Sequence, residues 1–440
     1  MRIARVLGVL IALLVLTGEL SFRSRDADAA LQGTVDAQII VALAISLLSG
    51  GWLLTRRLAG KMPRDPRRRS AFILRPGSPF QVFRLIGAAA VVSSYWSPTT
   101  IAPVRALQLV VVIEVAVEVV ATVDGNPPAL AAALSALEKT LVTGLCAAAA
   151  ITFLVPGFSP WFHIYGGPDR FRLLAMHPVA TANLMGLTAL LLTSRARRLR
   201  GLSASRGILS WSGVALLLVG VVATGERSSG LATFIALVLM LVSGGSAARR
   251  RQFLLLVVAT AGLLGAALLP TLLLRLVTRG QTTDQLATFS GRNLIFTEAW
   301  RLFTLKPVAG WGYNAGRSVF LPTIPWAGES HNVLVEIAVS FGVLGLILYG
   351  ALFFRWWRRL RAAQWSRPAA RELASESLAL VAFIMVIGVG ADSFAGPPRV
   401  AVLALGLALA LGEIQLAREK LPVVSCPKPT HWDAVLLTPR

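Results

Sequence analysis

The sequence has few charged residues and almost no cysteine. Only 15% of its 440 residues are charged, 55% are hydrophobic and the mean hydropathy is +0.69. A water-soluble fold of this length would lack the polar surface that it needs, so a lipid bilayer is the solvent that suits the chain. The two cysteines, Cys146 in an apolar segment and Cys426 in a polar tail, allow neither a disulfide framework nor a CxxC metal motif. Structural zinc and redox chemistry are therefore excluded.

Acidic residues are also scarce, with 21 Asp and Glu against 43 Lys and Arg and a formal net charge of +22. Such an excess also occurs in nucleic-acid binders. Here, however, the basic residues occur in short runs between long apolar segments and not on one face of a folded domain, so no nucleic acid is expected as a partner. The pattern is typical of membrane proteins whose cytoplasmic connections are rich in Lys and Arg.

Long apolar runs are abundant, and a spanning helix needs about 20 mostly apolar residues. We expect an all-α integral membrane protein with about 12 transmembrane helices in a single polytopic domain over residues 1–440, because no internal repeat or separate soluble domain is visible. The expected spans are 4–20, 36–55, 80–96, 101–123, 134–155, 178–194, 207–224, 229–245, 252–271, 332–354, 376–391 and 398–415.

Arginine runs occur in alternate connections, for example around residues 56–69, 195–200 and 355–361. If these connections are cytoplasmic, both termini lie inside, including a short tail over 416–440, and three regions lie outside. The outer regions are residues 156–177, the turn over 225–230 and a long loop over 272–331. The first helix also resembles a cleaved signal peptide, because Arg2 and Arg5 precede an apolar run, but a retained helix is the favoured interpretation.

The outer connections carry more cations than is usual for that side of a membrane. The long loop contains Arg275, Arg279, Arg292, Arg301, Lys306 and Arg317, and the other two connections contain Arg227, Arg170 and Arg172. Each of these side chains alone is explained by pairing with lipid phosphates. As a set they predict a binding site for an anion, and arginine suits a diphosphate because its planar fork forms bidentate hydrogen bonds.

His331 lies where the long outer loop meets the next expected span. A histidine can take a proton from a hydroxyl at neutral pH, whereas the alternative role at a helix start is that of a cap or interfacial residue. Asn332 and Glu336 follow it, and Glu336 is about one turn into the membrane. A carboxylate at that depth is costly unless it is paired, so Glu336 is expected either to orient a neighbour or to satisfy an arginine.

Other polar and aromatic residues have two interpretations each. Glu114 and Glu118 lie four residues apart within one expected span, either as a proton relay of a transporter or as a buried structural pair. His163 and His177, with Asp169, match no known metal-ligand spacing. Four aromatic residues of the outer loop are candidates for stacking on sugar rings or for anchoring at the membrane interface. These are Trp311, Tyr313, Phe320 and Trp326.

A run of motifs over residues 285–350 resembles the core of the O-antigen ligase and O-antigen polymerase superfamily. The motifs are Ser290-Gly291-Arg292-Asn293, Trp300, Lys306-Pro307, Gly310-Trp311-Gly312-Tyr313 and His331-Asn332, followed by Leu334, Glu336, Gly342 and Gly345. Two weaker segments agree, Arg227-Ser228 on the short turn and Arg172 with His177-Pro178. The sequence departs from the family pattern at Val179, where an asparagine is usual.

The resemblance implies an all-helical C-type glycosyltransferase fold in the bacterial cytoplasmic membrane, with the site facing outward and no cofactor or metal. The implied donor is a glycan on a polyprenyl diphosphate, and the acceptor is a glycan or glycolipid hydroxyl. Arg227 and Arg292 would hold the diphosphate, and His331 would activate the acceptor in an inverting displacement. Further substrate contacts are expected from Arg170, Arg172, Arg275, Arg279, Arg317, Asn332 and Glu336. A ligase is favoured; a polymerase, and less so a transporter or lipid flippase, are the alternatives.

Overall fold

The structure is a computed structural model of the chain, and its long elements are helices. It describes residues 1–19, 37–58, 77–123, 126–162, 169–174, 176–199, 204–243, 292–325, 330–362, 368–390 and 394–419. The first eight helices are α1 (Arg2–Glu19), α3 (Ala37–Leu58), α5 (Pro79–Ser93), α6 (Ala102–Val123), α7 (Pro127–Leu154), α8 (Pro178–Leu199), α9 (Ala204–Ala223) and α10 (Arg227–Ser243). They are followed by α14 (Arg292–Leu305), α15 (Gly316–Phe320), α16 (Val333–Ala362), α17 (Pro368–Gly390) and α18 (Val400–Glu419). The short elements are η1 (Ser94–Trp96), β1 (Trp161–Phe162) and β2 (Arg170–Phe171).

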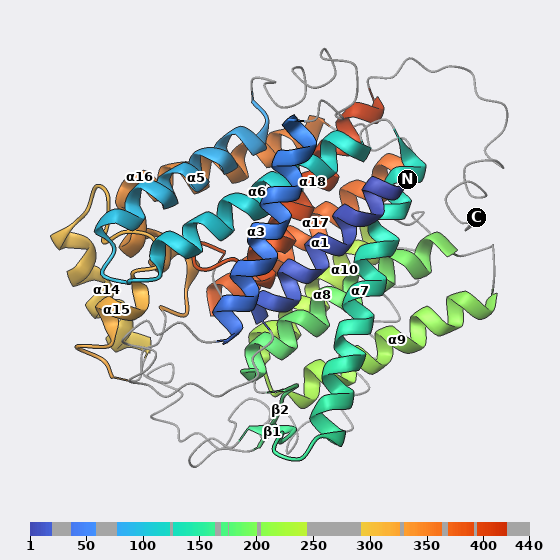
Figure 1. The fold of residues 1–440 in the computed structure, drawn as a ribbon, viewed down its shortest axis with the longest axis horizontal. Coiled ribbons are helices and arrows are strands. Elements are labelled where there is room, and N and C mark those ends of the chain that lie inside the picture. The colour runs from blue at the N-terminus through green and yellow to red at the C-terminus, as the bar shows by residue number, and fades with distance from the viewer. Residues whose placement is uncertain are drawn as a thin grey trace.

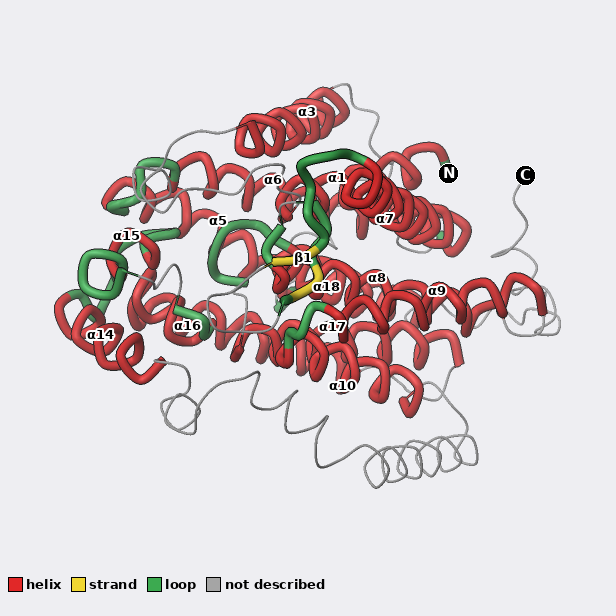
Figure 2. The backbone as a smooth tube through the Cα atoms, turned by 90° about the horizontal axis from the view of Figure 1, so that it is seen from below, coloured by secondary structure: helices red, strands yellow, loops and turns green. Residues whose placement is uncertain are grey.

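The long helices form a bundle, and the short helices α14 and α15 lie together at one end of it, beside α16 (Figure 1). The two strands pair as a small antiparallel hairpin under the bundle (Figure 2). The centre of the bundle is α18, in which every residue from 400 to 414 is buried. This stretch is rich in alanine and glycine, and small residues let helices approach closely in a membrane.

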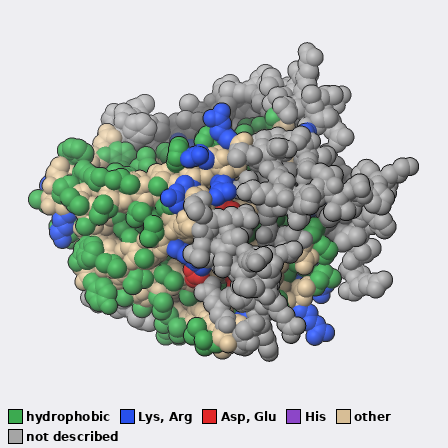
Figure 3. All heavy atoms as spheres, turned by 90° about the horizontal axis from the view of Figure 1, so that it is seen from above, with side chains coloured by type: hydrophobic (Ala, Val, Ile, Leu, Met, Phe, Trp, Pro, Cys, Tyr) green, Lys and Arg blue, Asp and Glu red, His purple; other side chains and the backbone are tan. Residues whose placement is uncertain are grey.

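Five helices are long and apolar enough to cross a membrane among the residues that the structure describes. They correspond to Ile39–Arg56, Ala102–Val123, Pro127–Leu154, Val333–Arg361 and Arg371–Gly390, and three shorter apolar helices accompany them. Large hydrophobic side chains on the surface of α5 and α16, such as Leu85, Ile347 and Phe354, are more than half exposed, as expected where a protein faces lipid. Figure 3 shows a broad hydrophobic area of this kind beside a group of Lys and Arg side chains. The chain is a multi-pass membrane protein.

Each expected span overlaps one of the helices, except 252–271, which lies outside the described residues. The number of twelve spans therefore stays a prediction. The helix ends differ from the prediction, most of all at the end of α16, which is Ala362 and not 354, and at the start of α17, which is Pro368 and not 376. The start of α7 is Pro127 and not 134, because Asn126 Oδ1 accepts a hydrogen bond from the N–H of Ala129 (3.2 Å) and caps the helix.

The first helix is an integral part of the bundle. A Cβ built on Gly8 would lie 2.2 Å from the carbonyl oxygen of Ala133, so α1 and α7 are in backbone contact. At the other end of α1, the carboxylate of Glu19 accepts a hydrogen bond from the N–H of Val400 (2.9 Å) at the start of α18. These contacts join α1 to α7 and α18, and the retention of the helix stays a prediction.

Polar contacts join helix ends that the charge pattern assigns to the same side of the membrane. At the arginine-rich ends, Arg195 pairs with Glu138, Arg198 with Glu376 (2.6 Å), and Ser78 with Glu413 (3.1 Å). At the opposite ends, Glu19 contacts Val400, Arg170 contacts Glu226 (3.1 Å) and Arg292 contacts Gly390 (2.7 Å). The arrangement of the bundle is therefore consistent with the expected alternation of the described helices.

Candidate active site

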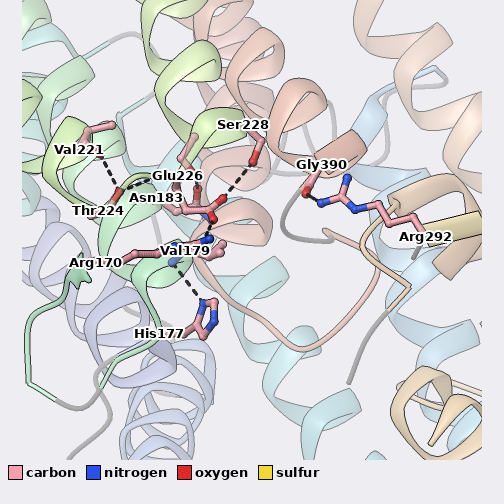
Figure 4. A network of polar contacts seen from close by, with 11 residues as sticks. Arg170, His177, Val179, Asn183, Val221, Thr224, Glu226, Ser228, Arg292 and Gly390 are labelled. Carbon is pink, nitrogen blue, oxygen red and sulfur yellow. Dashed lines mark hydrogen bonds and ion pairs between the residues drawn. The ribbon is translucent and has the colours of Figure 1, made fainter. Parts of the chain in front are cut away.

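Segments that carry two of the three residues expected to act in catalysis meet at the C-terminal end of α17. Arg292, the first residue of α14, donates a hydrogen bond from Nη2 to the carbonyl oxygen of Gly390, the last residue of α17, at 2.7 Å (Figure 4). A Cβ built on Gly390 would lie 2.8 Å from the Cβ of Ser228, so the start of α10 packs against the same residue. Arg227, immediately before Ser228, is exposed and is the first residue of α10. Arg292 and Arg227 therefore flank one helix end.

The segment that contains His331 also packs against this end of α17. A Cβ built on Gly388 would lie 3.0 Å from Cγ1 of Val333, so the first residue of α16 packs on the last turn of α17. His331 lies two residues before Val333 and is partly buried. Its backbone has a φ of 52°, a left-handed conformation that is costly for a residue with a side chain and that recurs at functional sites. All three residues expected in catalysis thus lie on segments that pack against the last turn of α17.

Asn332 has a clear structural role at this point. Its Oδ1 accepts hydrogen bonds from the N–H groups of Leu334 (3.0 Å) and Val335 (3.3 Å). This is the geometry of a helix N-cap, in which a side-chain oxygen satisfies the first free amides of the helix. Asn332 therefore ends the left-handed turn at His331 and starts α16. The sequence had suggested only that Asn332 contacts the substrate.

Glu336 lies one turn into α16 and is buried. Its carboxylate accepts a hydrogen bond from Oγ of Ser340 (3.3 Å) and covers Gly316, where a built Cβ would lie 2.6 Å from the nearer carboxylate oxygen. Tyr313, three residues before Gly316, is fully buried and donates from its hydroxyl to the carbonyl oxygen of Gly396 (2.7 Å). Burial raises the pKa of Tyr313, whose hydroxyl is therefore a hydrogen-bond donor at all physiological pH values.

A break in α16 separates its outer part, which begins next to His331, from the rest of the helix. Gly342 has φ 64° and ψ −155°, which leaves main-chain groups of the helix without partners inside the helix. The segment from Lys306 to Tyr313 supplies the partners, because it inserts beside the break. The hydrogen bonds are Trp311 N to Val339 O (2.8 Å), Gly312 N to Ser340 O (2.9 Å), Val343 N to Pro307 O (2.8 Å) and Leu344 N to Val308 O (3.3 Å). Main-chain groups in lipid must be satisfied within the protein, so this insertion stabilises a broken membrane helix.

The connection over 156–177 places both of its arginines against protein groups. Arg172 donates from Nε to the carbonyl oxygen of Ser159 (3.2 Å), and its guanidinium lies 5.5 Å from the centre of the Phe162 ring. Burial lowers the pKa of Arg172. Arg170, on β2, forms an ion pair with Glu226, which the sequence analysis did not single out.

His177 and the segment after it are also anchored. The Nδ1 of His177 accepts a hydrogen bond from the N–H of Val179 (3.3 Å) at the start of α8 (Figure 4). One turn further on, the buried Asn183 accepts a hydrogen bond from Oγ of Ser229 (2.8 Å) in α10. Asn183 was not predicted from the sequence to belong to the site, although an amide inside an apolar span next to a helix start is a signal that could have indicated it.

Two other cations of the long loop contact neighbouring side chains of that loop. Arg301 pairs with Glu298 of the same helix (2.6 Å), and the Nζ of Lys306 lies 4.1 Å from the centre of the Trp311 ring. Arg317 is exposed on α15. Arg275 and Arg279 lie outside the described residues.

The expected aromatic platform is largely part of the core. Tyr313 and Phe320 are fully buried, and the Trp311 indole donates to the carbonyl oxygen of Leu302 (2.9 Å). Their packing leaves Tyr313 and Phe320 no face for a sugar, so the stacking interpretation is wrong for these two residues. Trp326, like His163, lies outside the described residues.

The two acidic residues of α6 have arginine partners on neighbouring helices. Glu114 accepts two hydrogen bonds from Arg84 of α5 (2.6 and 2.7 Å), and Glu118 pairs with Arg56 of α3 (3.4 Å). These contacts favour the structural interpretation over a proton relay. Among the residues that the structure describes, no three His, Cys, Asp or Glu side chains are grouped as metal ligands would be.

One comparison with known proteins gives a match. A family model described as O-Antigen ligase matches residues 212–350, the stretch that contains Arg227, Arg292 and His331. No curated protein matches the chain significantly.

Proposed function

We propose, from the match of residues 212–350 to a family model described as O-Antigen ligase, that this chain transfers a saccharide from a polyprenyl-diphosphate carrier to an acceptor hydroxyl. The family match supports a membrane glycan ligase or polymerase, and it confirms the resemblance seen in the sequence. The donor, the acceptor and the residue roles below are our proposal. The observation that carries it is the packing of the segments of Arg227, Arg292 and His331 against one end of α17.

The two arginines are proposed to bind the diphosphate of the donor. A lipid diphosphate leaves readily if its growing negative charge is met by fixed cations in a site of low dielectric constant. Arg292 is fixed by its hydrogen bond to Gly390, and Arg227 lies in the first turn of α10, whose partial positive charge also favours an anion. Fixed guanidinium groups would then do what a divalent metal does in other phosphate enzymes.

His331 is proposed to act as the general base. It takes the proton of the acceptor hydroxyl while the hydroxyl oxygen forms a bond to the anomeric carbon of the donor sugar. The bond from that carbon to the diphosphate oxygen breaks, and the lipid diphosphate leaves with the electron pair. A single displacement of this kind inverts the anomeric centre.

The proposed location is the bacterial cytoplasmic membrane, with the site on its outer face. The support is the excess of arginine at those ends of the described helices that lie away from the candidate site. A polymerase would use the same donor chemistry with a second lipid-linked glycan as acceptor. A transporter is disfavoured, because Glu114 and Glu118 are paired with arginines of neighbouring helices.

The test is a transfer assay with purified protein, a defined lipid-linked oligosaccharide and two kinds of acceptor. Transfer to a glycolipid acceptor of another class supports a ligase, and elongation of a second lipid-linked chain supports a polymerase. We expect the activity to survive chelation of divalent metals, because the cations of the site are arginines. A strict metal requirement would contradict the proposed role of the arginines, and transfer to neither acceptor would contradict the proposed function.

A further inference from the structure

Glu226 places a buried carboxylate directly beside a site proposed to bind an anion. Only 8% of its side chain is exposed, and it precedes Arg227 in the chain. A carboxylate here repels a diphosphate unless its charge is compensated. The surroundings of Glu226 therefore decide whether it opposes donor binding or supports it.

Both carboxylate oxygens of Glu226 are engaged by protein groups. Oε1 lies 3.1 Å from Nη1 of Arg170 on β2, and Oε2 accepts a hydrogen bond of 3.4 Å from Oγ of Ser228 (Figure 4). The main-chain N–H of Glu226 donates to Oγ1 of Thr224 (3.2 Å). The carboxylate is thus an internal counter-ion of Arg170, and the pair links the 156–177 connection to the start of α10.

The residues on both sides of Arg227 are fixed by contacts with other parts of the protein. Glu226 is held by Arg170, and Ser229 donates to the buried Asn183 of α8 (2.8 Å). Gly225 allows the turn before Glu226, because its φ of 63° is a left-handed conformation that favours glycine, and the alkyl part of Arg170 lies in ordinary contact with this position (3.9 Å from a built Cβ). Arg227 itself is exposed between these anchors.

We propose that Glu226 and Arg170 form a positioning pair that holds Arg227 in place for the diphosphate of the donor. This inference rests on the proposed function, because it assigns the pair to the donor side of that site. It gives Arg170 a role in holding the site rather than in direct contact with substrate. It also predicts that the pair affects donor binding and leaves acceptor binding unchanged.

The test uses Glu226→Gln, Arg170→Gln and the double variant of the full chain. Binding of a polyprenyl diphosphate to purified protein is measured first, with the polyprenyl monophosphate for comparison. Each single variant should weaken diphosphate binding by roughly 3- to 100-fold, the range that corresponds to the coupling between contacting residues. The double variant should be no weaker than the weaker single variant, because the two residues act as one unit. In the transfer assay, the KM for donor should rise while the KM for acceptor stays the same.

Glu298→Gln is the matched control, because Glu298 pairs with Arg301 in an exposed pair of the outer loop. It should change neither diphosphate binding nor either KM. If Glu226→Gln lowers only the melting temperature, or tightens diphosphate binding, the positioning role is wrong. If the wild type binds the diphosphate but transfers no glycan, the proposed function fails, while the binding measurements still decide the role of the pair.

Discussion

At the residue scale, Arg292 and His331 are held by different kinds of contact, which suits the different roles proposed for them. Arg292 is tied through its side chain to the carbonyl oxygen of Gly390. His331 is fixed through its main chain, because its left-handed backbone and the cap at Asn332 keep it out of α16. A fixed guanidinium suits charge stabilisation, and an imidazole at a helix boundary can meet an incoming hydroxyl.

Replacing each residue should therefore separate binding from chemistry. Arg292→Lys keeps a charge but loses the planar fork, so we expect donor binding to weaken by about 10- to 100-fold, the equivalent of one hydrogen bond to a charged group at about 1.5–3 kcal/mol. His331→Ala should still bind donor, while transfer falls by roughly 10²- to 10⁴-fold, the usual contribution of a general base. Donor binding and single-turnover transfer by purified protein measure the two effects. Near-normal transfer by His331→Ala would show that another group is the base.

The sequence itself indicated Arg227 and Arg292 as members of an unusual set of outer cations and His331 as a candidate base, and the resemblance to a family implied their separate roles. The sequence also indicated Arg170, but as a residue that contacts the substrate. Its partner Glu226 is 56 residues away, and no local pattern connects two residues at that separation. The same limit applies to Glu114 and Glu118, whose spacing suggested one shared role, whereas each has its own arginine on another helix.

At the element scale, hydropathy predicted the helices well and the break in α16 not at all. An apolar run of about 20 residues marks a span because the bilayer sets its length. Gly342 lies inside such a run, where a glycine by itself is compatible with a continuous helix. The break exists because the Lys306–Tyr313 segment packs beside it and supplies hydrogen bonds, which is a tertiary contact. This contact also explains glycines of the family motif, since a Cβ on Gly310 would lie 2.5 Å from the main chain of Ser340.

Gly342→Ala should therefore disturb the site. A residue with a side chain in this backbone conformation costs of order 1–3 kcal/mol. Its Cβ would also lie 2.4 Å from the carbonyl oxygen of Val308. We expect a lower temperature of thermal inactivation in detergent and a loss of transfer, because the break joins the outer part of α16, next to His331, to the loop that follows α14.

Gly350→Ala is the control for this prediction, because Gly350 lies on the same helix with no atom within 4 Å of its built Cβ. That variant should keep the stability and activity of the wild type. Equal behaviour of the two variants would show that the break does not hold the site.

At the scale of the whole molecule, the contacts between helix ends agree with the orientation of the helices that the loop charges predict. Arginine-rich ends contact one another on one side, and the segments of the candidate site contact one another on the other side. Charge counting could predict this grouping, because loop charge sets orientation. It could not predict which ends touch, because those contacts depend on packing around α18.

Two helices can test the orientation, because each carries residues for labelling at both ends. The 28 residues of α7 extend roughly 42 Å at 1.5 Å per residue, enough to cross a hydrocarbon core about 30 Å thick. Asn126 and Trp161 are exposed at its two ends, and Thr323 and Arg361 are exposed before and at the end of α16. Single cysteines at these four positions, in a chain with Cys146 and Cys426 replaced by alanine, should give two labelling patterns with a membrane-impermeant thiol reagent.

In cells with any outer envelope made permeable, cysteines at positions 161 and 323 should react, and those at 126 and 361 should react only after lysis. The reason is that arginine-rich ends are expected to be retained in the cytoplasm, so the segments that hold Arg227, Arg292 and His331 are expected to face outward. Each helix serves as its own control, since a leaky membrane would label both of its ends. The reverse pattern would place the candidate site in the cytoplasm, where an acceptor on the outer face could not reach His331, and the proposed transfer at the outer face would then be wrong.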